Sequence, residues 1–307
     1  MLCRDAIPIQ TKSGVLIALL AGRPAGKSWK DRMTNLGDAV EDTRRKMLFT
    51  KGQLEPHRRG TYQTVATGIS YGGGAMVIFT FTTIDIAPLC HQQEPGELGF
   101  SSKCNARAVG ALREVPEFAH LSGFVNSERY SLKALISYNA PIESFESYAT
   151  LLSTFCKTTL TRLEAANPSL QRPFPGSAFG SISVNFGPDV CTIPHKDFKN
   201  LSWGWCAVTS FGDYNYKKGG HLVLWDLGIA VEFPPHSTIL IPSAIVEHSN
   251  TAIQPGESRS TITQYNSAGL FRWVAYDFTP KWLAEELGIK PESWWAMPKH
   301  MFSKIPN

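Results

Sequence analysis

Residues 179–210 read FGSISVNFGPDVCTIPHKDFKNLSWGWCAVTS and contain three short runs in which apolar and polar residues alternate. These runs, at 179–186, 190–195 and 203–210, are separated by Gly, Pro, Asn and Asp, as is typical of short strands joined by turns. The same pattern continues downstream, with further candidate strands at 221–225, 229–233, 237–241, 244–250, 257–265 and 271–278. Eight or so short strands predict a β-sandwich or barrel, and a double-stranded β-helix, the jelly-roll form, fits this count.

The sequence before residue 170 has a different pattern, in which helical and strand signals alternate. Apolar residues recur at helical spacing over 29–47 and 142–166, so we expect a helix in each range. β-branched and aromatic residues over 61–86 predict two strands around the glycines at 72–74, and the polar residues 89–110 predict a loop.

Together these patterns predict an α+β protein with a double-stranded β-helix core and with N-terminal helices packed on one of its sheets. The 307 residues and their 43% hydrophobic content are enough for one large core. We therefore expect a single catalytic unit, in which residues 1–170 form a helical and β extension and residues 171–307 form the jelly-roll core.

Charge and cysteine content indicate the kind of partner and compartment. The formal net charge of +4 favours anionic partners mildly, and basic residues cluster at 44–46 and 57–59, although such clusters are also common as solvated surface. The six cysteines include no C-x-x-C pair, so we expect reduced thiols in a cytosolic or nuclear protein. The apolar run 15–21 is too short to cross a bilayer, and neither membrane insertion nor secretion is expected.

The motif with the clearest chemistry is His195-Lys196-Asp197, because residues two apart on an extended strand point to the same face. The imidazole of His195 and the carboxylate of Asp197 can therefore bind one ion together. His248 follows in a strand-like segment and completes a set of two histidines and one carboxylate, which holds iron(II) and leaves coordination positions open for 2-oxoglutarate and dioxygen. The alternatives are two partly buried structural histidines, or a cupin-like domain that binds metal without oxidation chemistry.

A basic residue for the co-substrate follows the second histidine. Gln254, Pro255 and Gly256 indicate a turn, and we expect a hairpin there that places His248 opposite Thr261 and turns Arg259 towards the metal. The guanidinium of Arg259 could then pair with the distal carboxylate of 2-oxoglutarate, and Thr261 could add a hydroxyl hydrogen bond. This prediction depends on the register, because one additional loop residue would turn Arg259 outward.

Residues 21–28, AGRPAGKS, satisfy a permissive phosphate-loop pattern with alanine in the first glycine position. A phosphate loop also needs a following helix, a second strand that ends in a magnesium-binding acidic residue, and a doubly wound parallel sheet. Only the helix is expected here, and Asp85 is a poor acidic partner. Nucleotide hydrolysis that uses Lys27 stays an alternative of a different class.

With the metal and arginine positions assigned, residues 179–278 resemble the TET and base-J-binding-protein family of dioxygenases, especially its mushroom members. The family's iron ligands match His195, Asp197 and His248. Its co-substrate arginine matches Arg259, and its hydroxyl residue matches Thr261, which is serine in the TETs. The family's base-contacting asparagine and stacking tyrosine match Asn200 and Tyr265, whereas a base-contacting histidine is replaced by Ser267. Further matches are the strand motif at 219–226 and the glycines at 72–74, and the cysteine-rich zinc module of animal TETs is absent.

The resemblance implies an Fe(II)- and 2-oxoglutarate-dependent dioxygenase that oxidises the methyl group of a base in methylated DNA. For 5-methylcytosine the products would be 5-hydroxymethylcytosine and further oxidised forms, whereas oxidation of N6-methyladenine would release adenine and formaldehyde. The base would flip out of the duplex onto Tyr265 and Asn200, and Asp189 could accept a hydrogen bond from its amino group, although a turn aspartate is the plainer interpretation of Asp189. The extension before residue 170 would contact the DNA. A nuclear monomer is expected, and a catalytically silent metal- or DNA-binding module is the alternative.

Overall fold

The structure is a computed structural model that describes residues 6–24, 27–71, 94–126 and 149–291. The glycines at 72–74, most of the second strand predicted within 61–86 and the first residues of the helix predicted over 142–166 lie outside these ranges.

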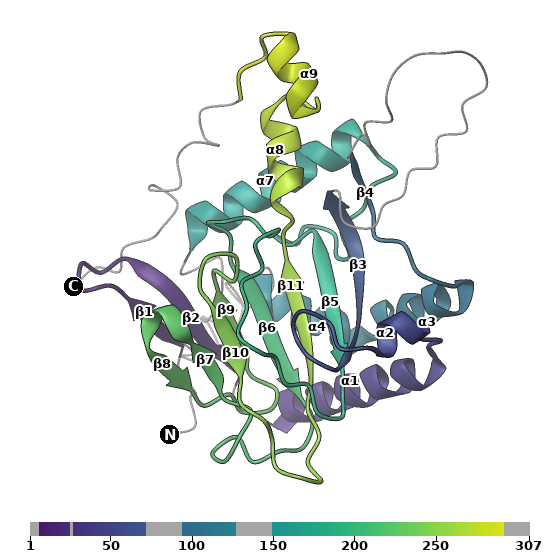
Figure 1. The fold of residues 1–307 in the computed structure, drawn as a ribbon, viewed down its shortest axis with the longest axis vertical. Helices are drawn as coiled ribbons and strands as arrows, with labels where there is room; N and C mark the ends of the chain where they lie inside the picture. Colours follow the sequence, from purple (N-terminus) through teal and green to yellow (C-terminus); the bar gives the residue numbers. More distant parts are fainter. Residues whose placement is uncertain (1–5, 25–26, 72–93, 127–148, 292–307) are drawn as a thin grey trace.

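The core consists of a large and a small antiparallel sheet between which the chain alternates (Figure 1). The central strands of the large sheet lie in the order β9, β6, β11, β5, with bounds Thr238–Ile241, Cys206–Phe211, Ser260–Tyr265 and Ser181–Phe186. The small sheet has the order β10, β7, β8, with bounds His248–Asn250, Leu222–Leu224 and Ile229–Val231. This alternation is that of a double-stranded β-helix, so the predicted jelly-roll core is confirmed.

Strands from the N-terminal part extend the large sheet on both sides. On one side β2 (Leu16–Gly22) pairs with β9 and carries β1 (Ile7–Gln10) at the edge. On the other, β3 (Gln63–Tyr71) pairs with β5 and carries β4 (Pro95–Glu97). The N-terminal third is therefore built into the core sheet through its strands.

N-terminal helices pack on the outer face of the large sheet, as predicted (Figure 1). They include α1 (Lys27–Lys46) and α4 (Pro116–Asn126), and α3 (Lys103–Arg113) packs on α1. Helices α7 (Thr150–Ala166) and α8 (Ala268–Ala275) pack on each other at the end of the sheet where β11 leads into α8. The short helices are α2 (Lys51–Leu54), α9 (Lys281–Glu286) and the 3-10 turn η1 (Trp225–Leu227). None of the helices in the described residues is long and apolar enough to cross a membrane.

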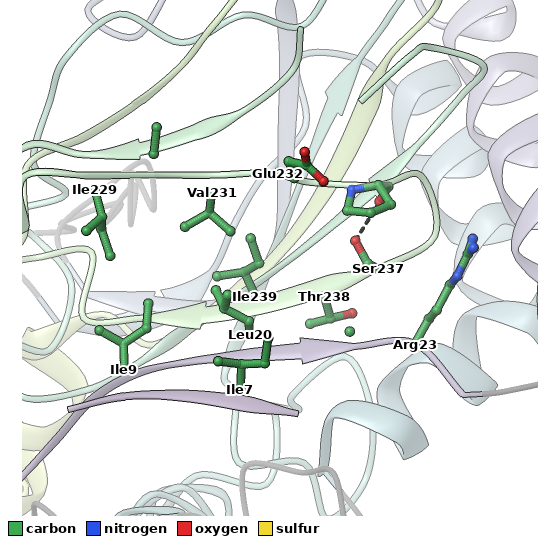
Figure 2. Close-up of a pocket in the computed structure, with 13 residues that line it drawn as sticks. Ile7, Ile9, Leu20, Arg23, Ile229, Val231, Glu232, Ser237, Thr238 and Ile239 are labelled. Carbon is green, nitrogen blue, oxygen red and sulfur yellow. Dashed lines mark hydrogen bonds between the residues drawn. The ribbon is translucent and has the colours of Figure 1, made fainter. Parts of the chain in front are cut away.

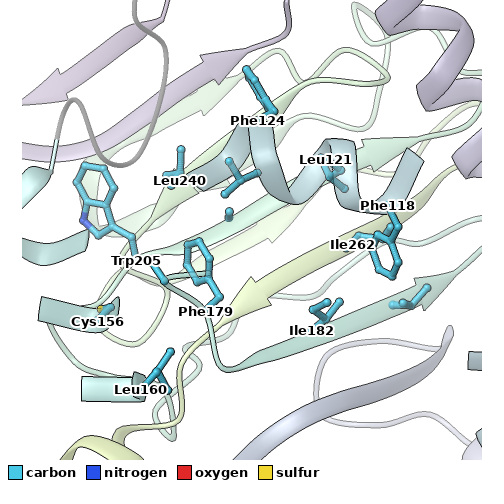
Figure 3. Close-up of a cluster of buried hydrophobic side chains, with 14 of the residues drawn as sticks. Phe118, Leu121, Phe124, Cys156, Leu160, Phe179, Ile182, Trp205, Leu240 and Ile262 are labelled. Carbon is cyan, nitrogen blue, oxygen red and sulfur yellow. The ribbon is translucent and has the colours of Figure 1, made fainter. Parts of the chain in front are cut away.

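The alternation of residues along β5 shows how the two faces of the large sheet differ. Ile182, Val184 and Phe186 point outward into the helix-covered core, where Leu121 and Leu160 also lie (Figure 3). The residues between them are polar and point inward, towards the small sheet. Both faces of β5 are therefore buried, and the interior of the β-helix receives a polar lining at this position.

Three secondary-structure predictions are wrong. The range 190–195 was predicted as a strand, but it forms only an isolated bridge at His195. The predicted strand at 271–278 is mainly helix α8, whose buried Leu270, Phe271 and Val274 form one helical face. The predicted loop at 89–110 includes β4 and overlaps helix α3, which Ser102 caps by accepting a hydrogen bond from the backbone N–H of Asn105. Few apolar residues mark α3 in the sequence because its buried face includes Asn105 and Ala108.

The sheet directions also bear on the phosphate-loop alternative. The strand before residues 21–28 is β2, which is antiparallel to both of its neighbours, and every strand pairing in the described ranges is antiparallel. Helix α1 begins at Lys27, as the motif requires. A phosphate loop, however, follows a strand of a parallel sheet, whereas β2 lies in an antiparallel sheet.

Candidate metal and co-substrate site

The edge of the small sheet positions the two histidines. His195 and His248 form an antiparallel bridge, in which the N–H of His195 donates to the carbonyl of His248 at 3.1 Å and the reverse bond is 3.0 Å. Their rings lie side by side, with centroids 4.3 Å apart. Asp197 follows two residues after His195, and its N–H donates to the Ser243 carbonyl at 2.8 Å. The backbone thus holds all three side chains on one side of this edge.

The three side chains form a compact group of ligand atoms. The Asp197 carboxylate lies 3.8 Å from Nε2 of His195 and 3.9 Å from Nε2 of His248, and one ligand atom from each of the three residues lies within 4.8 Å of the others. In each ring Nδ1 faces a backbone carbonyl, Ile193 at 2.8 Å and Val246 at 2.9 Å. Nδ1 therefore carries the proton, and the lone pair of Nε2 is directed to the metal position.

Electrostatics keep both histidines in the neutral form that binds metal. Burial lowers the pKa of His195 to about 4, and the nearby charge of His248 adds to this effect. Burial also lowers the pKa of His248, against the opposing effects of the Val246 carbonyl and Asp197. Two neutral imidazoles and one carboxylate match the donor set that binds iron(II) with open positions.

Arg259 lies inside the β-helix, 1% exposed. Its Nη1 donates to the Val190 carbonyl at 2.6 Å, and its guanidinium lies 5.6 Å from the ring centroid of Phe233 and 6.0 Å from that of Tyr214. Nε and Nη2 are buried without a hydrogen-bond partner. A buried cation with two free donors needs an anion, and a carboxylate that accepts both bonds fits this requirement.

Thr261 lies two residues after Arg259, on the same face of β11. Its hydroxyl accepts a hydrogen bond from the Asn185 amide at 2.8 Å, and Asn185 in turn accepts one from Thr64 at 2.9 Å. Thr261 is buried at 3% exposure, so its hydroxyl lines the interior beside Arg259 and is already oriented by β5.

The predicted hairpin between His248 and Arg259 is wrong. β10 pairs with β7 in the small sheet, whereas β11 pairs with β5 and β6 in the large sheet, so His248 is not opposite Thr261. The residues between the two strands cross from one sheet to the other, and Arg259 pairs its backbone with that of Pro188 and Val190. Arg259 still reaches the interior because the inner faces of the two sheets oppose each other.

The residues expected to contact a base lie in three different settings. Tyr265 is on the inner face of β11, and burial raises its pKa to about 12, with a smaller effect from the nearby charge of Asp197. The Asn200 amide donates to Cys206 Sγ and to Ser243 Oγ, both at 3.3 Å, and its backbone pairs with Ser267. Asp189 is exposed, and its backbone pairs with Arg259.

The basic turn at 57–60 lies near the three ligand candidates, although its sequence alone does not indicate this position. Nη1 of Arg58 donates to the Lys196 carbonyl at 2.8 Å, and Nη2 lies 3.7 Å from the Asp197 carboxylate. The guanidinium also lies 5.1 Å from the ring centroid of Phe198, which is 66% exposed. Arg58 and Lys196 are 138 residues apart in sequence, so no local sequence pattern predicts their contact.

A hollow lies away from these residues, between β1, β2 and β9 of the large sheet and β8 of the small sheet (Figure 2). Its volume is about 350 Å³, and most of its lining is aliphatic, from side chains such as Ile9, Leu20 and Ile239. Arg23 and Glu232 add charge to this lining. Neither the three metal-binding candidates nor Arg259 lines this hollow.

No protein-family model matches the chain, and no curated protein matches it. It is similar to the solved structure of NgTET1 in complex with 5mC DNA, with 14% identity, a TM-score of 0.42, and coverage of 86% of this chain and 77% of that chain. It is also similar to OsALKBH1, with 12% identity, a TM-score of 0.39, and coverage of 85% and 100%. A further similar structure is the 2OG complex of the viral collagen prolyl hydroxylase vCPH from Paramecium Bursaria Chlorella virus-1, with 14% identity, a TM-score of 0.24, and coverage of 29% and 59%.

Proposed function

We propose that the protein is an Fe(II)- and 2-oxoglutarate-dependent dioxygenase that oxidises a methyl group on a base of DNA. The observation that carries the proposal is the presence, inside one double-stranded β-helix, of a His195, Asp197 and His248 cluster together with a buried Arg259 that has two unpartnered nitrogens. A metal site alone would also be compatible with a binding domain. The unpartnered nitrogens of the buried Arg259 guanidinium additionally favour an acidic co-substrate.

The residues present fit both cofactors. The three side chains would hold iron, and Arg259 would pair with the distal carboxylate of 2-oxoglutarate while Thr261 adds a hydroxyl contact. When bound, the iron and 2-oxoglutarate supply the activation of dioxygen that oxidises a C–H bond. The protein side chains keep the ligand nitrogens unprotonated, orient the co-substrate, and exclude water from the buried arginine.

The assignment to DNA rests on two residues that match the TET pattern. Tyr265 lies on the same face of β11 as Thr261, so its ring would offer a stacking platform beyond the co-substrate. Asn200 would read the edge of the base, although both hydrogens of its amide are engaged with Cys206 and Ser243. The contact it offers to a base is therefore the amide oxygen.

The favoured product is 5-hydroxymethylcytosine, with further oxidised forms, from 5-methylcytosine. Oxidative demethylation of N6-methyladenine is the second candidate, because an amide oxygen can accept a hydrogen bond from the amino group of either base. Asp189 is a weaker candidate for this contact, since its side chain is exposed. We also propose that the N-terminal extension contacts the DNA and that the protein acts as a monomer in the nucleus.

The test is incubation with iron(II), 2-oxoglutarate and oligonucleotides that carry 5-methylcytosine or N6-methyladenine, followed by mass spectrometry of the nucleosides. Oxidised or demethylated nucleosides together with succinate are expected. Formation of succinate without any change in the bases would support the dioxygenase assignment and indicate a substrate other than these methylated bases. Absence of both would leave a catalytically silent metal-binding module.

A further inference from the structure

Tyr62 carries a second orphaned polar group in the interior. The residue is 3% exposed, and its hydroxyl is buried without a hydrogen-bond partner. A tyrosine hydroxyl normally finds a partner when it is buried, because a buried hydroxyl without a hydrogen bond destabilises the fold. A phenylalanine would serve equally well for packing alone, so the hydroxyl indicates a ligand that is bound during function.

The strand register places Tyr62 on the inner face, beside Arg259. Tyr62 comes immediately before β3, and Thr64, two residues later, points inward to bond Ser183 and Asn185. The ladders pair Thr64 and Thr261 with the same residue, Asn185. Gln63 pairs with Phe186, the last residue of β5, so Tyr62 lies beside Gly187, which follows β5 and has no side chain. A Cβ built at Gly187 would lie 3.0 Å from the Arg259 carbonyl, so Arg259 adjoins the same position.

A tight turn holds the ring of Tyr62 in this orientation. His57 and Gly60 exchange backbone hydrogen bonds of 2.9 and 3.0 Å, and the His57 ring bonds the Tyr62 carbonyl at 2.8 Å and meets the Tyr62 ring edge-on. A Cβ at Gly60 would lie 2.6 Å from the Cys191 carbonyl and 2.9 Å from the Tyr62 ring. The turn is thus docked on the segment that leads into His195.

The charges that act on Tyr62 include one of the metal-ligand candidates and the co-substrate arginine. Burial raises the pKa of Tyr62, Arg59 and Arg259 oppose this rise, and Asp197 adds to it. The hydroxyl therefore stays protonated as a donor at neutral pH, within electrostatic reach of both a metal ligand and the orphaned guanidinium.

We propose that Tyr62 is a further co-substrate-binding residue, whose hydroxyl donates a hydrogen bond to an oxygen of 2-oxoglutarate held between the metal and Arg259. The inference rests on the proposed function and deepens it, because it assigns to the N-terminal part a role in the co-substrate pocket. The turn at 57–62 then forms a wall of the active site as well as a surface loop.

The experiment measures equilibrium binding of 2-oxoglutarate by isothermal titration calorimetry to protein loaded with Mn(II), which binds like iron but does not turn over. Tyr62→Phe removes only the hydroxyl and should weaken binding about tenfold, since a hydrogen bond to a charged acceptor is of this strength. Tyr276→Phe, which alters a tyrosine at the end of α8, is the matched control and should bind 2-oxoglutarate like the wild type.

The Mn(II) affinity of Tyr62→Phe should equal that of the wild type, and its melting temperature should be no lower, because the variant removes a hydroxyl that has no partner in the fold. The loss then concerns the co-substrate alone. Equal affinity of Tyr62→Phe and wild type for 2-oxoglutarate would overturn the role of Tyr62 and leave the proposed function intact. A wild-type protein that binds Mn(II) but not 2-oxoglutarate would instead overturn the proposed function, and the role of Tyr62 with it.

Discussion

His195 and His248 lie directly opposite each other across an antiparallel bridge, and each donates its backbone N–H to the carbonyl of the other, at 3.1 and 3.0 Å. The metal site depends on the register of this bridge, because a shift of the backbone pairing by one residue would turn one of the two imidazoles to the other face. The same pair explains why ligands 53 residues apart in sequence can share an ion, as the small sheet brings them to ring centroids 4.3 Å apart.

His195→Ala and Asp197→Ala should each abolish iron binding and turnover, because two remaining ligands cannot hold a labile iron(II) in a facial arrangement. Iron content after anaerobic loading and succinate formation measure the two effects. His221→Ala, which alters a histidine outside the cluster, should retain full iron content. Wild-type turnover in either ligand variant would remove the metal assignment.

Arg259→Ala should raise the concentration of 2-oxoglutarate needed for half-maximal turnover by orders of magnitude and leave iron affinity nearly unchanged. Deleting one partner of a buried charge pair costs roughly 3 to 5 kcal/mol. Titration of 2-oxoglutarate into Mn(II)-loaded protein measures the loss of affinity, and circular dichroism checks that the variant is folded. Unchanged dependence on 2-oxoglutarate would mean that the orphaned nitrogens of Arg259 serve another anion.

Acid should destabilise the protein through His236. Burial lowers its pKa from 6.5 to about 4, so below pH 6.5 the unfolded chain takes up a proton that the folded protein resists. The free energy of unfolding should therefore fall between pH 6.5 and 4, with up to roughly 3 kcal/mol from this residue. Asn tolerates the positive φ of 67° at this position, so urea denaturation of His236→Asn should show a shallower decline. Parallel declines in both proteins would exclude His236 as the cause.

The sequence was sufficient to predict those parts of the site that depend on local geometry. The two-residue spacing of His195 and Asp197 predicts a shared ligand position without knowledge of the fold, and the structure brings both together with His248. The buried position of Arg259 was predicted through a hairpin that does not exist. A Pro-Gly turn between two strand-like segments favours a hairpin locally, but here the two strands complete opposite sheets, and only the tertiary fold decides this.

The contributions of the N-terminal part were not predictable in the same way. Tyr62 and Arg58 reach the site only because β3 pairs with β5 and because the turn at 57–60 packs on the segment before His195. Such pairings are long-range, and no local sequence pattern marks Tyr62. Arg58 belongs to a basic cluster, but such a cluster is equally typical of solvent-exposed surface. Helix α8 was mistaken for a strand because it contains Phe271, Trp273 and Val274, and strands favour aromatic and β-branched residues.

Tyr265→Ala separates oxidation of DNA bases from oxidation of a protein or small molecule. The ring lies on the inner face of β11, beyond Thr261, where a flipped base would stack on it. Stacking of a base on an aromatic side chain contributes about 1 to 3 kcal/mol, so turnover of methylated DNA should fall roughly ten- to a hundredfold. Uncoupled decarboxylation of 2-oxoglutarate in the absence of DNA should stay near the wild-type rate, because the metal and Arg259 are unchanged.

Asn200→Ala should also reduce turnover of methylated DNA, and it should shift the preference between 5-methylcytosine and N6-methyladenine if its amide oxygen reads the base. The Asn200 amide also bonds Ser243, whose carbonyl holds the backbone N–H of Asp197, so this variant should bind iron less tightly as well. Iron affinity therefore has to be measured beside the product ratio from mass spectrometry. If Tyr265→Ala and Asn200→Ala both oxidise methylated DNA at the wild-type rate under subsaturating substrate, the base pocket lies elsewhere. The assignment to DNA would then lose the residues on which it rests, whereas the iron and 2-oxoglutarate chemistry would stand on His195, Asp197, His248 and Arg259 alone.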